Sequence, residues 1–497
     1  MKVVFVNLHG DTNMVAAYLH SLIEKAGYNI TTIHFRRLLL EITPVSEEEL
    51  QVLKREIDKI NPDVVMMSVN SISFWTAVKV SKILKDRKIV WGGVQPLIAP
   101  EMCLKYVDII VRGEGDGAAI DVLRAIENGK RMNKIKNVWV KKKNNIVKND
   151  FRPLVEDLNL LPIPDFSDKN KLYIIGNRVY NKNPLPHLKY GYNICFSRGC
   201  PFSCRYCINH FYNKTFKHKY LRRRSVDSVI GELLHAKKIF PKMTNVAFWD
   251  DVFMTDLNWL REFADKYKKH INLPFFAYGN PKFVKEESMI LLKKAGIDFF
   301  DMGVQSGSER IRKVFGRFDS NDDIIRADRI LYKLNVVHGY DIIFSEFETS
   351  KDIEEGINFF LKLKKPFKVQ RNRLVYYPGF EITNMALKEG RIKKEQIASM
   401  DKNLRGQVMN RGEAQKFPMM NYFYFIGNKL IPNFVVKYML KNKWHQKHPV
   451  IMTEVGEMIN KIENTKYSIK NMLKMIYLGE YSYAYNRIFR KEHYLGL

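Results

Sequence analysis

The sequence of 497 residues predicts an α/β protein in three parts: a doubly wound parallel sheet, a partial (β/α) barrel and a helical C-terminal part. Three observations predict this class. Short runs rich in Val and Ile alternate with amphipathic stretches over residues 1–135, the alternation returns over 172–390, and residues 391–497 have helical periodicity with many aromatics. We expect domains with these bounds, joined by a hairpin and linker at 136–171.

Five runs in the first part have the composition of buried parallel strands. They are KVVFVNL (2–8), NITTIHF (29–35), DVVMMSV (63–69), KIVWGGV (88–94) and DIIVRGEG (108–115). Because a doubly wound sheet binds its ligand at the carboxyl ends of its strands, the candidate binding residues follow these runs. They are His9, Gly10, Ser68, Asn70, Ser71, Gly92, Gly93, Gly113, Glu114 and Gly115. Ordinary tight turns use the same residue types, and no GxGxxG follows the first strand, which argues against a dinucleotide.

A hairpin with Asn144 and Asn145 at its turn follows, and then an extended linker that ends near Asp165. We expect the second domain to begin near Leu172. Its predicted strands are YNICFSR (192–198), NVAFWDD (245–251), FFAYGN (275–280), FFDMGVQSG (299–307), GYDIIFS (339–345) and RNRLVYYPG (371–379). Ser225 is the expected N-cap of the helix after the first strand. Repeated strand and helix units of this kind predict a barrel with its site at the strand ends.

The overall composition limits the classes of protein. Apolar residues make up 46% of the chain, but no run of about 18 of them predicts a membrane span. The opening MKVVFVNLHGD does not resemble a signal peptide, so we expect a cytoplasmic protein. A net charge of +29 is compatible with nucleic acid, an anionic membrane surface or an acidic substrate, and Lys and Arg are spread along the chain. The aromatic stretch 421–440 predicts a helical cap on the barrel, with weak association at a membrane surface as the alternative.

Four of the five cysteines lie between Cys195 and Cys207, directly after the first barrel strand. An odd count in a long chain does not indicate a disulfide framework. Cys200, Cys204 and Cys207 form C-x3-C-x2-C, a spacing that can place three thiolates on one inorganic cluster. A zinc ion with Cys195 as fourth ligand is the alternative, and it would make the chain a zinc-stabilised nucleic-acid-binding protein.

This motif, with Tyr206 before its last cysteine and the flanking SRGCPFSCRYC, resembles the signature of the radical S-adenosylmethionine enzymes. The similarity to their cobalamin-binding branch extends from residue 1 to about 400. It is carried by VWGGVQPLIAPE, VRGEGDGAAIDVL, FWDDVFMTD, GVQSGSERIRKVFGR and VYYPGFEITNMALKEGRI, in the order typical of that branch. The resemblance implies a Rossmann-like cobalamin-binding sheet before the radical barrel.

The resemblance also implies roles for individual residues. Cys200, Cys204 and Cys207 would bind a [4Fe-4S] cluster whose open iron chelates S-adenosylmethionine, with Tyr206 near the adenine. Asp250 and Asp251 would contact the methionine amino group, and Gln305 and Ser306 the carboxylate or ribose. Without the resemblance, these two pairs are also compatible with simple loop caps.

Two departures from the family pattern affect these expectations. Where the family has GFPGET after its fifth strand, this chain has FSEFET, with Phe344, Glu346 and Phe347 in place of Gly, Pro and Gly. The usual backbone approach to the nucleoside is therefore not expected here. The cobalt-ligand motif D-x-H-x-x-G is represented only by Asn7, His9 and Thr12. Without an orienting carboxylate, we expect His9 to be a turn histidine and not a cobalt ligand.

Cys103 and Cys195 are expected to be buried packing residues. Methylthiotransferases share the QSGSER stretch but need three further N-terminal cysteines, and only Cys103 is available, so that class is excluded.

The resemblance implies an enzyme that methylates an unactivated carbon of a small-molecule, lipid or natural-product substrate. Cleavage of S-adenosylmethionine would give the hydrogen-abstracting radical, cobalamin would carry the methyl group, and an external low-potential donor would supply electrons. An oxidative cyclase or rearrangement enzyme of the same architecture is the alternative. Nucleic acid is not an expected partner.

Overall fold

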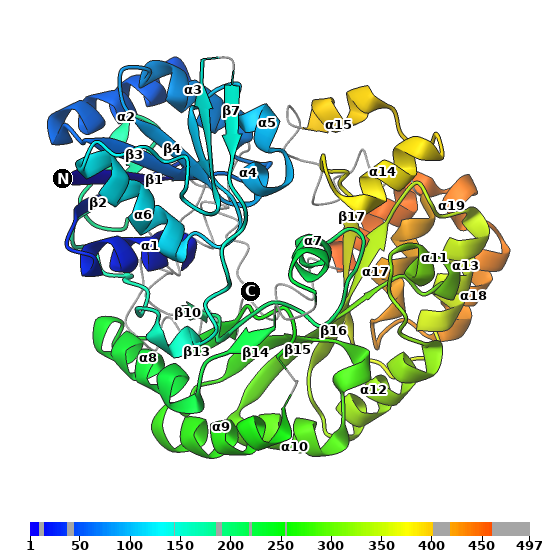
Figure 1. The fold of residues 1–497 in the computed structure, drawn as a ribbon. Coiled ribbons are helices and arrows are strands. Elements are labelled where there is room, and N and C mark those ends of the chain that lie inside the picture. Colours follow the sequence, from blue (N-terminus) through cyan, green and yellow to red (C-terminus); the bar gives the residue numbers. More distant parts are fainter. Residues whose placement is uncertain are drawn as a thin grey trace.

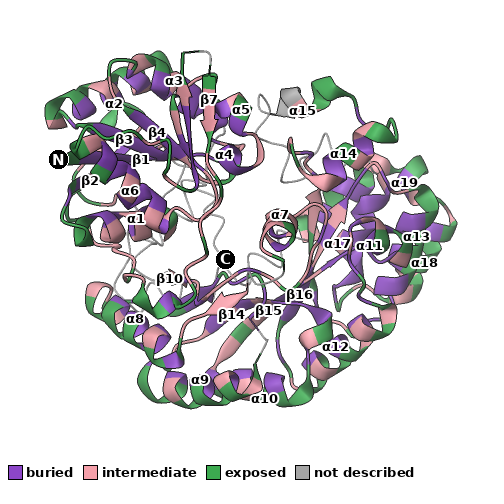
Figure 2. Ribbon diagram, in the orientation of Figure 1, coloured by how far each residue is buried: buried purple, intermediate pink, exposed green. Residues whose placement is uncertain are grey.

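The computed structural model describes residues 1–8, 14–36, 44–143, 145–184, 191–217, 221–253, 256–400 and 418–459. Figure 1 shows an N-terminal α/β unit, in blue, set across from the inner side of a second, curved sheet, in green, whose helices lie along its outer side. The buried residues gather in the strands and on the inward sides of these helices (Figure 2). The fold therefore has two separate sheets, each with its own core.

The N-terminal sheet has nine strands in the order β7-β6-β5-β4-β3-β1-β2-β8-β9. Its strands are β1 (Lys2–Leu8), β2 (Asn29–Phe35), β3 (Val64–Ser68), β4 (Ile89–Gly92), β5 (Ile109–Val111), β6 (Val138–Lys142), β7 (Asn145–Lys148), β8 (Lys171–Ile175) and β9 (Arg178–Tyr180). The segment from β5 to β8 is parallel throughout, and β6, β7 and β9 are antiparallel additions. The chain runs outward to β2 and then returns through β3 to β5, which confirms the predicted doubly wound sheet.

Helices cover both faces of this sheet. They are α1 (Met14–Lys25), α2 (Glu47–Ile60), α3 (Phe74–Ile83), α4 (Val94–Ile98), α5 (Pro100–Cys103) and α6 (Asp116–Glu127). Apolar residues of α2 and α3 pack on one face, and those of α1 and α6 pack on the other. Ser46 and Glu49 form a capping box at the start of α2. Cys103 is fully buried in the first of these layers, which confirms its packing role.

The segment between the two sheets differs from the expectation. Asn145 pairs with Lys142 as the first residue of β7 and is therefore not a turn residue, and Asn144 lies outside the described residues. The hairpin is part of the N-terminal sheet. The boundary expected at Leu172 falls inside β8, which pairs with β2, so the second sheet begins only with β10 at Gly191. The sequence did not show this because β8 pairs with β2 through backbone groups, which carry no sequence signal.

The second sheet is parallel and has the order β10-β13-β14-β15-β16-β17. Its strands are β10 (Gly191–Ile194), β13 (Asn245–Phe248), β14 (Phe275–Gly279), β15 (Ile297–Gln305), β16 (His338–Phe344) and β17 (Lys368–Arg373). The helices between and after them are α7 (Ile208–Thr215), α8 (Val226–Ile239), α9 (Leu257–His270), α10 (Glu286–Ala295), α11 (Glu309–Val314), α12 (Asn321–Lys333) and α13 (Ser350–Phe360). A short ribbon of β11 (Ser197–Arg198) and β12 (Arg222–Arg223) follows β10. Since β10 and β17 remain edges within the described chain, the partial barrel is confirmed, as is the Ser225 N-cap of α8, whose hydroxyl accepts from the Ser228 amide.

The C-terminal part packs on the barrel. Its described elements are α14 (Glu381–Lys388), α15 (Lys394–Met400), the 3₁₀ turn Pro418–Tyr422, α17 (Phe423–Ile426), α18 (Asn433–Lys441) and α19 (Trp444–Lys447). Tyr422, Phe423 and Phe425 are buried in the barrel's own apolar core, as predicted for a helical cap. In the part of the chain that the structure describes, no helix combines the length and apolar character needed to cross a membrane.

Candidate active site

The C-x3-C-x2-C motif lies in one loop, residues 200–207, which we call the cysteine loop. It follows β10 and β11, and Cys207 directly precedes α7. The Cys207 amide donates to the Cys204 carbonyl (2.9 Å), and the Asn213 side chain donates to the Cys200 carbonyl (3.0 Å). Hydrogen bonds to backbone carbonyls therefore fix the shape of the loop, and the thiols are not needed for that purpose.

The thiols have surroundings suited to binding an inorganic cluster. Asn209 Nδ2 lies 3.6 Å from Cys207 Sγ, and Arg317 Nη1 lies 3.7 Å from Cys204 Sγ. Hydrogen bonds to sulfur are a main means by which proteins set the potential of a cluster. Burial raises the pKa of Cys200 and Cys207 to about 12, so metal binding has to displace their protons.

The described thiols are not arranged around a single metal ion. Among the residues that the structure describes, no group of three His, Cys, Asp or Glu side chains is arranged to hold a single metal ion. A zinc site requires thiolates that converge on one ion at about 2.3 Å. A cubane instead binds each cysteine through a different iron, so its thiolates remain farther apart. The zinc alternative with Cys195 as fourth ligand gains no support from this geometry.

Cys195 is only partly exposed, but it does not belong to a core as expected. It follows β10, and burial together with the carboxylates of Asp250 and Asp251 raises the pKa of its thiol well above the usual value. Cys195 is therefore less completely packed than expected, because the strand ends just before it and its side chain lies beside the acidic pair.

The two aspartates after β13 have different environments. Asp250 is buried, and its Oδ1 accepts from the amides of Phe196 (3.0 Å) and Ser197 (2.6 Å) and from the Ser197 hydroxyl (2.5 Å). Burial raises its pKa to about 7, and its Oδ2 has no hydrogen-bond partner among the described residues. Asp251 is exposed and is oriented by Asn209 Nδ2 (2.9 Å). Asp250 thus anchors the residues that lead into the cysteine loop, whereas Asp251 is available to a ligand.

Gln305, at the end of β15, is held in a strained conformation. Its φ of 70° is unusual for a residue with a side chain, and the pairing with β16 shifts register at this point. The side chain is buried, and within the described part of the chain its Oε1 lacks a hydrogen-bond partner. A strained backbone and an unsatisfied buried acceptor are common at binding sites, and both fit a ligand-contacting role for Gln305.

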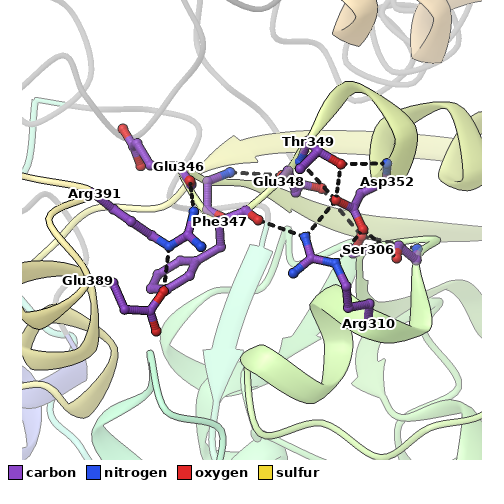
Figure 3. Close-up of polar contacts among 11 residues, drawn as sticks. Ser306, Arg310, Glu346, Phe347, Glu348, Thr349, Asp352, Glu389 and Arg391 are labelled. Atoms are coloured by element: carbon purple, nitrogen blue, oxygen red, sulfur yellow. Dashed lines mark hydrogen bonds and ion pairs between the residues drawn. The ribbon is translucent and has the colours of Figure 1, made fainter.

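Ser306 is engaged within the protein (Figure 3). Its hydroxyl accepts from the Ser308 amide (3.2 Å) and donates to Glu348 Oε1 (3.4 Å). Burial raises the pKa of Glu348 to about 8. Ser306 therefore acts as a loop cap in this structure, which was the alternative reading for the Gln–Ser pair.

The FSEFET segment contacts the C-terminal part, and Figure 3 shows Glu346 and Phe347 of this segment beside Arg391. Phe344 contacts Phe423 of the C-terminal part, with ring centroids 5.7 Å apart. The Arg391 guanidinium lies 4.8 Å from the Phe347 ring and donates to the Glu346 carbonyl (2.9 Å). These residues replace the small turn of the family with side chains that bind the C-terminal part to the barrel, so they are committed to packing.

Arg317 is a site residue that the sequence analysis missed. It is buried, and besides Cys204 its guanidinium contacts the Tyr206 hydroxyl (3.5 Å) and pairs with Asp319 (3.0 Å). The Tyr206 ring packs on Phe315, 5.4 Å between centroids. The only signal was its place at the end of GVQSGSERIRKVFGR. A buried positive charge therefore lies beside Cys204.

The candidate residues of the N-terminal sheet divide into two groups. Asn70 caps the turn before α3 through the Ser73 amide (2.8 Å), and Ser71 binds Gln95 (2.6 Å). Gly93 has φ 95°, and a Cβ there would lie 2.8 Å from the Val69 carbonyl and 2.9 Å from the Ser68 hydroxyl. The contacts of these residues are within the protein.

The second group leaves room for a ligand. A side chain at Gly115 would meet no close atom, and one at Gly92 would meet only Val111. His9 and Gly10 lie outside the described residues.

Glu114, which was expected at the ligand edge, also joins the two domains. It forms ion pairs with Arg222 and with Arg198 (3.4 Å). Asp116, the first residue of α6, receives two bonds from Arg198 (2.7 and 2.9 Å) and one from Tyr18. Burial alone would raise the pKa of Asp116, but the bonds and charge of Arg198 lower it by more. The pKa of Asp116 is therefore below its usual value. Because Gly113 (φ 76°) belongs to the same loop, the ligand edge of the first sheet is tied to the residues just before Cys200.

Replacing Arg198 with Met should lower the free energy of unfolding by about 3 kcal/mol, because the buried Asp116 carboxylate loses its bidentate partner. Urea denaturation at neutral pH measures this. The control is Lys169→Met, which breaks the exposed pair with Glu24 and should cost less than about 1 kcal/mol. Equal losses in the two variants would contradict a stabilising role for the domain contact.

The geometry agrees with comparisons to known proteins. The family model "Radical SAM superfamily" matches residues 194–360, and the model "B12 binding domain" matches residues 1–123. An uncharacterized methyltransferase of Pyrococcus horikoshii is 25% identical over 343 residues, which cover 67% of this chain and 71% of the relative. The anaerobic magnesium-protoporphyrin IX monomethyl ester cyclase of Rubrivivax gelatinosus is 22% identical over 467 residues, covering 86% and 78%.

Among solved structures, the cobalamin-dependent S-adenosylmethionine radical enzyme OxsB superposes with a TM-score of 0.64 at 16% identity, covering 100% of this chain and 76% of that one. This similarity shows that the fold is shared. The chain belongs to the cobalamin-binding radical S-adenosylmethionine enzymes. Its cofactors are a [4Fe-4S] cluster, S-adenosylmethionine and cobalamin.

Proposed function

We propose that the protein is a methyltransferase that transfers a methyl group to an unactivated carbon of a small molecule. The observation that carries the proposal is the direct ion pairing between Arg198, two residues before Cys200, and Glu114 and Asp116 at the ligand edge of the N-terminal sheet. The pairing holds the two cofactor-binding regions edge to edge. Such placement is useful to an enzyme in which both cofactors act on one substrate.

When bound, the cluster and S-adenosylmethionine supply a hydrogen-abstracting radical, and cobalamin supplies a methyl group. The protein's part is binding and orientation. Cys200, Cys204 and Cys207 hold the cluster, Asp251 accepts from the methionine amino group, and Gln305 contributes a carbonyl oxygen to S-adenosylmethionine. Asp250 keeps the cysteine loop in register with β13 through Ser197.

The choice of methyl transfer rests on the pairing of the two sites and on the methyltransferase relative. The cyclase relative spans more of the chain and keeps an oxidative cyclase or rearrangement as the second candidate. The two reactions differ in what they require of cobalamin. Only a methyltransferase needs to load a methyl group from S-adenosylmethionine onto it, which releases S-adenosylhomocysteine.

The reconstituted protein should therefore form S-adenosylhomocysteine from S-adenosylmethionine only when cobalamin is added together with a low-potential reductant. Anaerobic incubation followed by liquid chromatography and mass spectrometry measures this, with protein lacking cobalamin as the control. Formation of 5′-deoxyadenosine should need the cluster but not cobalamin. Abundant 5′-deoxyadenosine with no cobalamin-dependent S-adenosylhomocysteine would favour the cyclase reading.

An external electron donor is part of this proposal, because the cysteines outside the motif are only Cys103 and Cys195 and cannot bind a second cluster.

A membrane-surface contact would be at Leu430, Phe434 and Tyr438, whose side chains are 77%, 71% and 60% exposed. These lie in or beside α18, on the outside of the C-terminal part.

A further inference from the structure

The inner face of the barrel carries two kinds of side chain. Along each strand, alternate residues pack outward against the helices: Phe300, Met302 and Val304 on β15 belong to the barrel core. The residues between them face inward. A Cβ on Gly339 would lie 2.8 Å from the Phe299 ring and 3.0 Å from Asp301 Oδ1, which shows that these two side chains share the inner face.

One half of this face is aromatic. Trp249, Phe276, Tyr278 and Phe299 come from the neighbouring strands β13 to β15 and from the residue after β13. Phe276 stacks on Phe299 at 5.8 Å and 9°, and Trp249 lies 6.1 Å from Phe276 and 5.6 Å from Tyr278. All four are partly exposed, with Trp249 at 37%. Aromatic side chains that remain accessible inside a barrel are suited to stacking on a flat ring.

The other half is acidic. Asp301 pairs in register with Tyr278 and Gly339, and Asp341 pairs with Gly303, one level closer to Gln305. Asp301 is 6% exposed, and neither Asp301 Oδ1 nor Asp341 Oδ1 has a hydrogen-bond partner among the described residues. The inner face of β17 adds Gln370, in register with Asp341. Asp301 is buried and Asp341 is partly buried, and each has a carboxylate oxygen without a donor among the described residues, which a cationic ligand would provide.

We propose that the barrel interior binds a substrate that carries both a flat apolar ring and an ammonium group, with the ring on Trp249, Phe276, Tyr278 and Phe299 and the ammonium between Asp301 and Asp341. The proposal rests on the proposed function, whose substrate class it names. Gly303 and Gln305 follow Asp301 on the same inner face of β15 toward the strand ends. An ammonium bound between Asp301 and Asp341 therefore leaves the rest of the substrate to extend toward the strand ends, where S-adenosylmethionine would bind.

The charges around the acidic pair support this assignment. Burial raises the pKa of Asp301 to about 6, with Lys368 and His338 acting in the opposite direction, and burial and Asp301 raise that of Asp341 to about 8. Lys368 pairs in register with Gly339, in the same row as Asp301, and its ammonium lies 5.3 Å from the Phe299 ring. Without a ligand, the pair is charged only at a cost, and a bound cation removes that cost. The alternative, an anion bound by Lys368, is an outcome of the test.

Three probes with one ring and different charges test the proposal: 1-naphthylmethylamine, 1-naphthylmethanol and 1-naphthaleneacetate. Equilibrium dialysis against the full-length protein loaded with cluster and cobalamin gives each dissociation constant. We expect the amine to bind roughly tenfold to a hundredfold more tightly than the alcohol, the range of a charge-assisted hydrogen bond. Asp301→Asn and Asp341→Asn should each remove most of this difference.

The control is Asp298→Asn, on the same strand but exposed at its start, which should leave all three constants unchanged. The Asn variants should fold, because a neutral amide replaces a carboxylate whose charged form is disfavoured by burial, and a thermal melt checks this. Equal binding of amine and alcohol, tighter binding of the acetate, or binding of none of the probes would each overturn the proposal. No turnover is needed, so these outcomes are independent of whether methyl transfer occurs.

Discussion

Cys200→Ala, Cys204→Ala and Cys207→Ala should each abolish iron binding. The cluster's absorbance band at ~400 nm and all cleavage of S-adenosylmethionine should be lost with it. Each removes one of three thiolates, and within the described structure Asn209 and Arg317, the groups that contact the sulfurs, are donors that cannot replace a ligand. Iron and sulfide analysis with the visible spectrum measures the loss. This is the largest effect that we expect from any single substitution.

Cys103→Ala is the matched control, because that thiol is fully buried in the apolar core of the N-terminal domain and is not part of the motif. Cys195→Ala should also keep the cluster. Its thiol is next to Asp250 and Asp251, so the change is expected to alter the local packing and not the iron content. Loss of iron from Cys195→Ala, with an intact thermal melt, would show that the ligand set includes a fourth cysteine.

Arg317→Met should lower the reduction potential of the cluster, on the order of 100 mV, because it removes a buried positive charge 3.7 Å from Cys204 Sγ. A lower potential makes the cluster harder to reduce, so formation of 5′-deoxyadenosine should fall with a weak reductant and recover in part with a stronger one. A potentiometric titration followed by electron paramagnetic resonance measures the shift directly.

Arg317→Lys retains the charge and should restore part of the potential. The matched control is Arg205→Met. Arg205 lies in the cysteine loop itself, but its guanidinium pairs with Glu381 (2.8 Å) and donates to the Val314 carbonyl (2.9 Å). It should change the potential much less. An unchanged potential in Arg317→Met would mean that Asp319, which pairs with Arg317, already cancels its charge at the cluster.

The sequence predicted those parts of the fold that depend on local pattern. All eleven strands expected for the two sheets form, because runs such as KVVFVNL and FFDMGVQ are suited to buried parallel pairing. It missed the addition of β8 between β2 and the edge strand β9, since the pairing of a short strand is decided by tertiary contacts. The prediction of the barrel boundary at Leu172 failed for that reason.

The candidate site was predictable where a motif is continuous and was not where it depends on distant residues. Cys200, Cys204 and Cys207 lie within one loop and were found. Glu114 was selected for its place after β5, but Arg222, 108 residues away, pairs with it. Arg317 reaches Cys204 across 113 residues. Only the folded structure brings these charges together, so no spacing in the sequence could reveal them.

The fate of the methyl group tests the central claim most directly. The loaded enzyme, with a low-potential reductant, is incubated with S-adenosylmethionine labelled in its methyl group and with a small-molecule extract of cells that express the protein. We expect labelled methyl in a product, and S-adenosylhomocysteine and 5′-deoxyadenosine that increase together. If 5′-deoxyadenosine forms and an extract component is consumed while no label reaches a product and no S-adenosylhomocysteine appears, methyl transfer is contradicted and the cyclase or rearrangement reading replaces it.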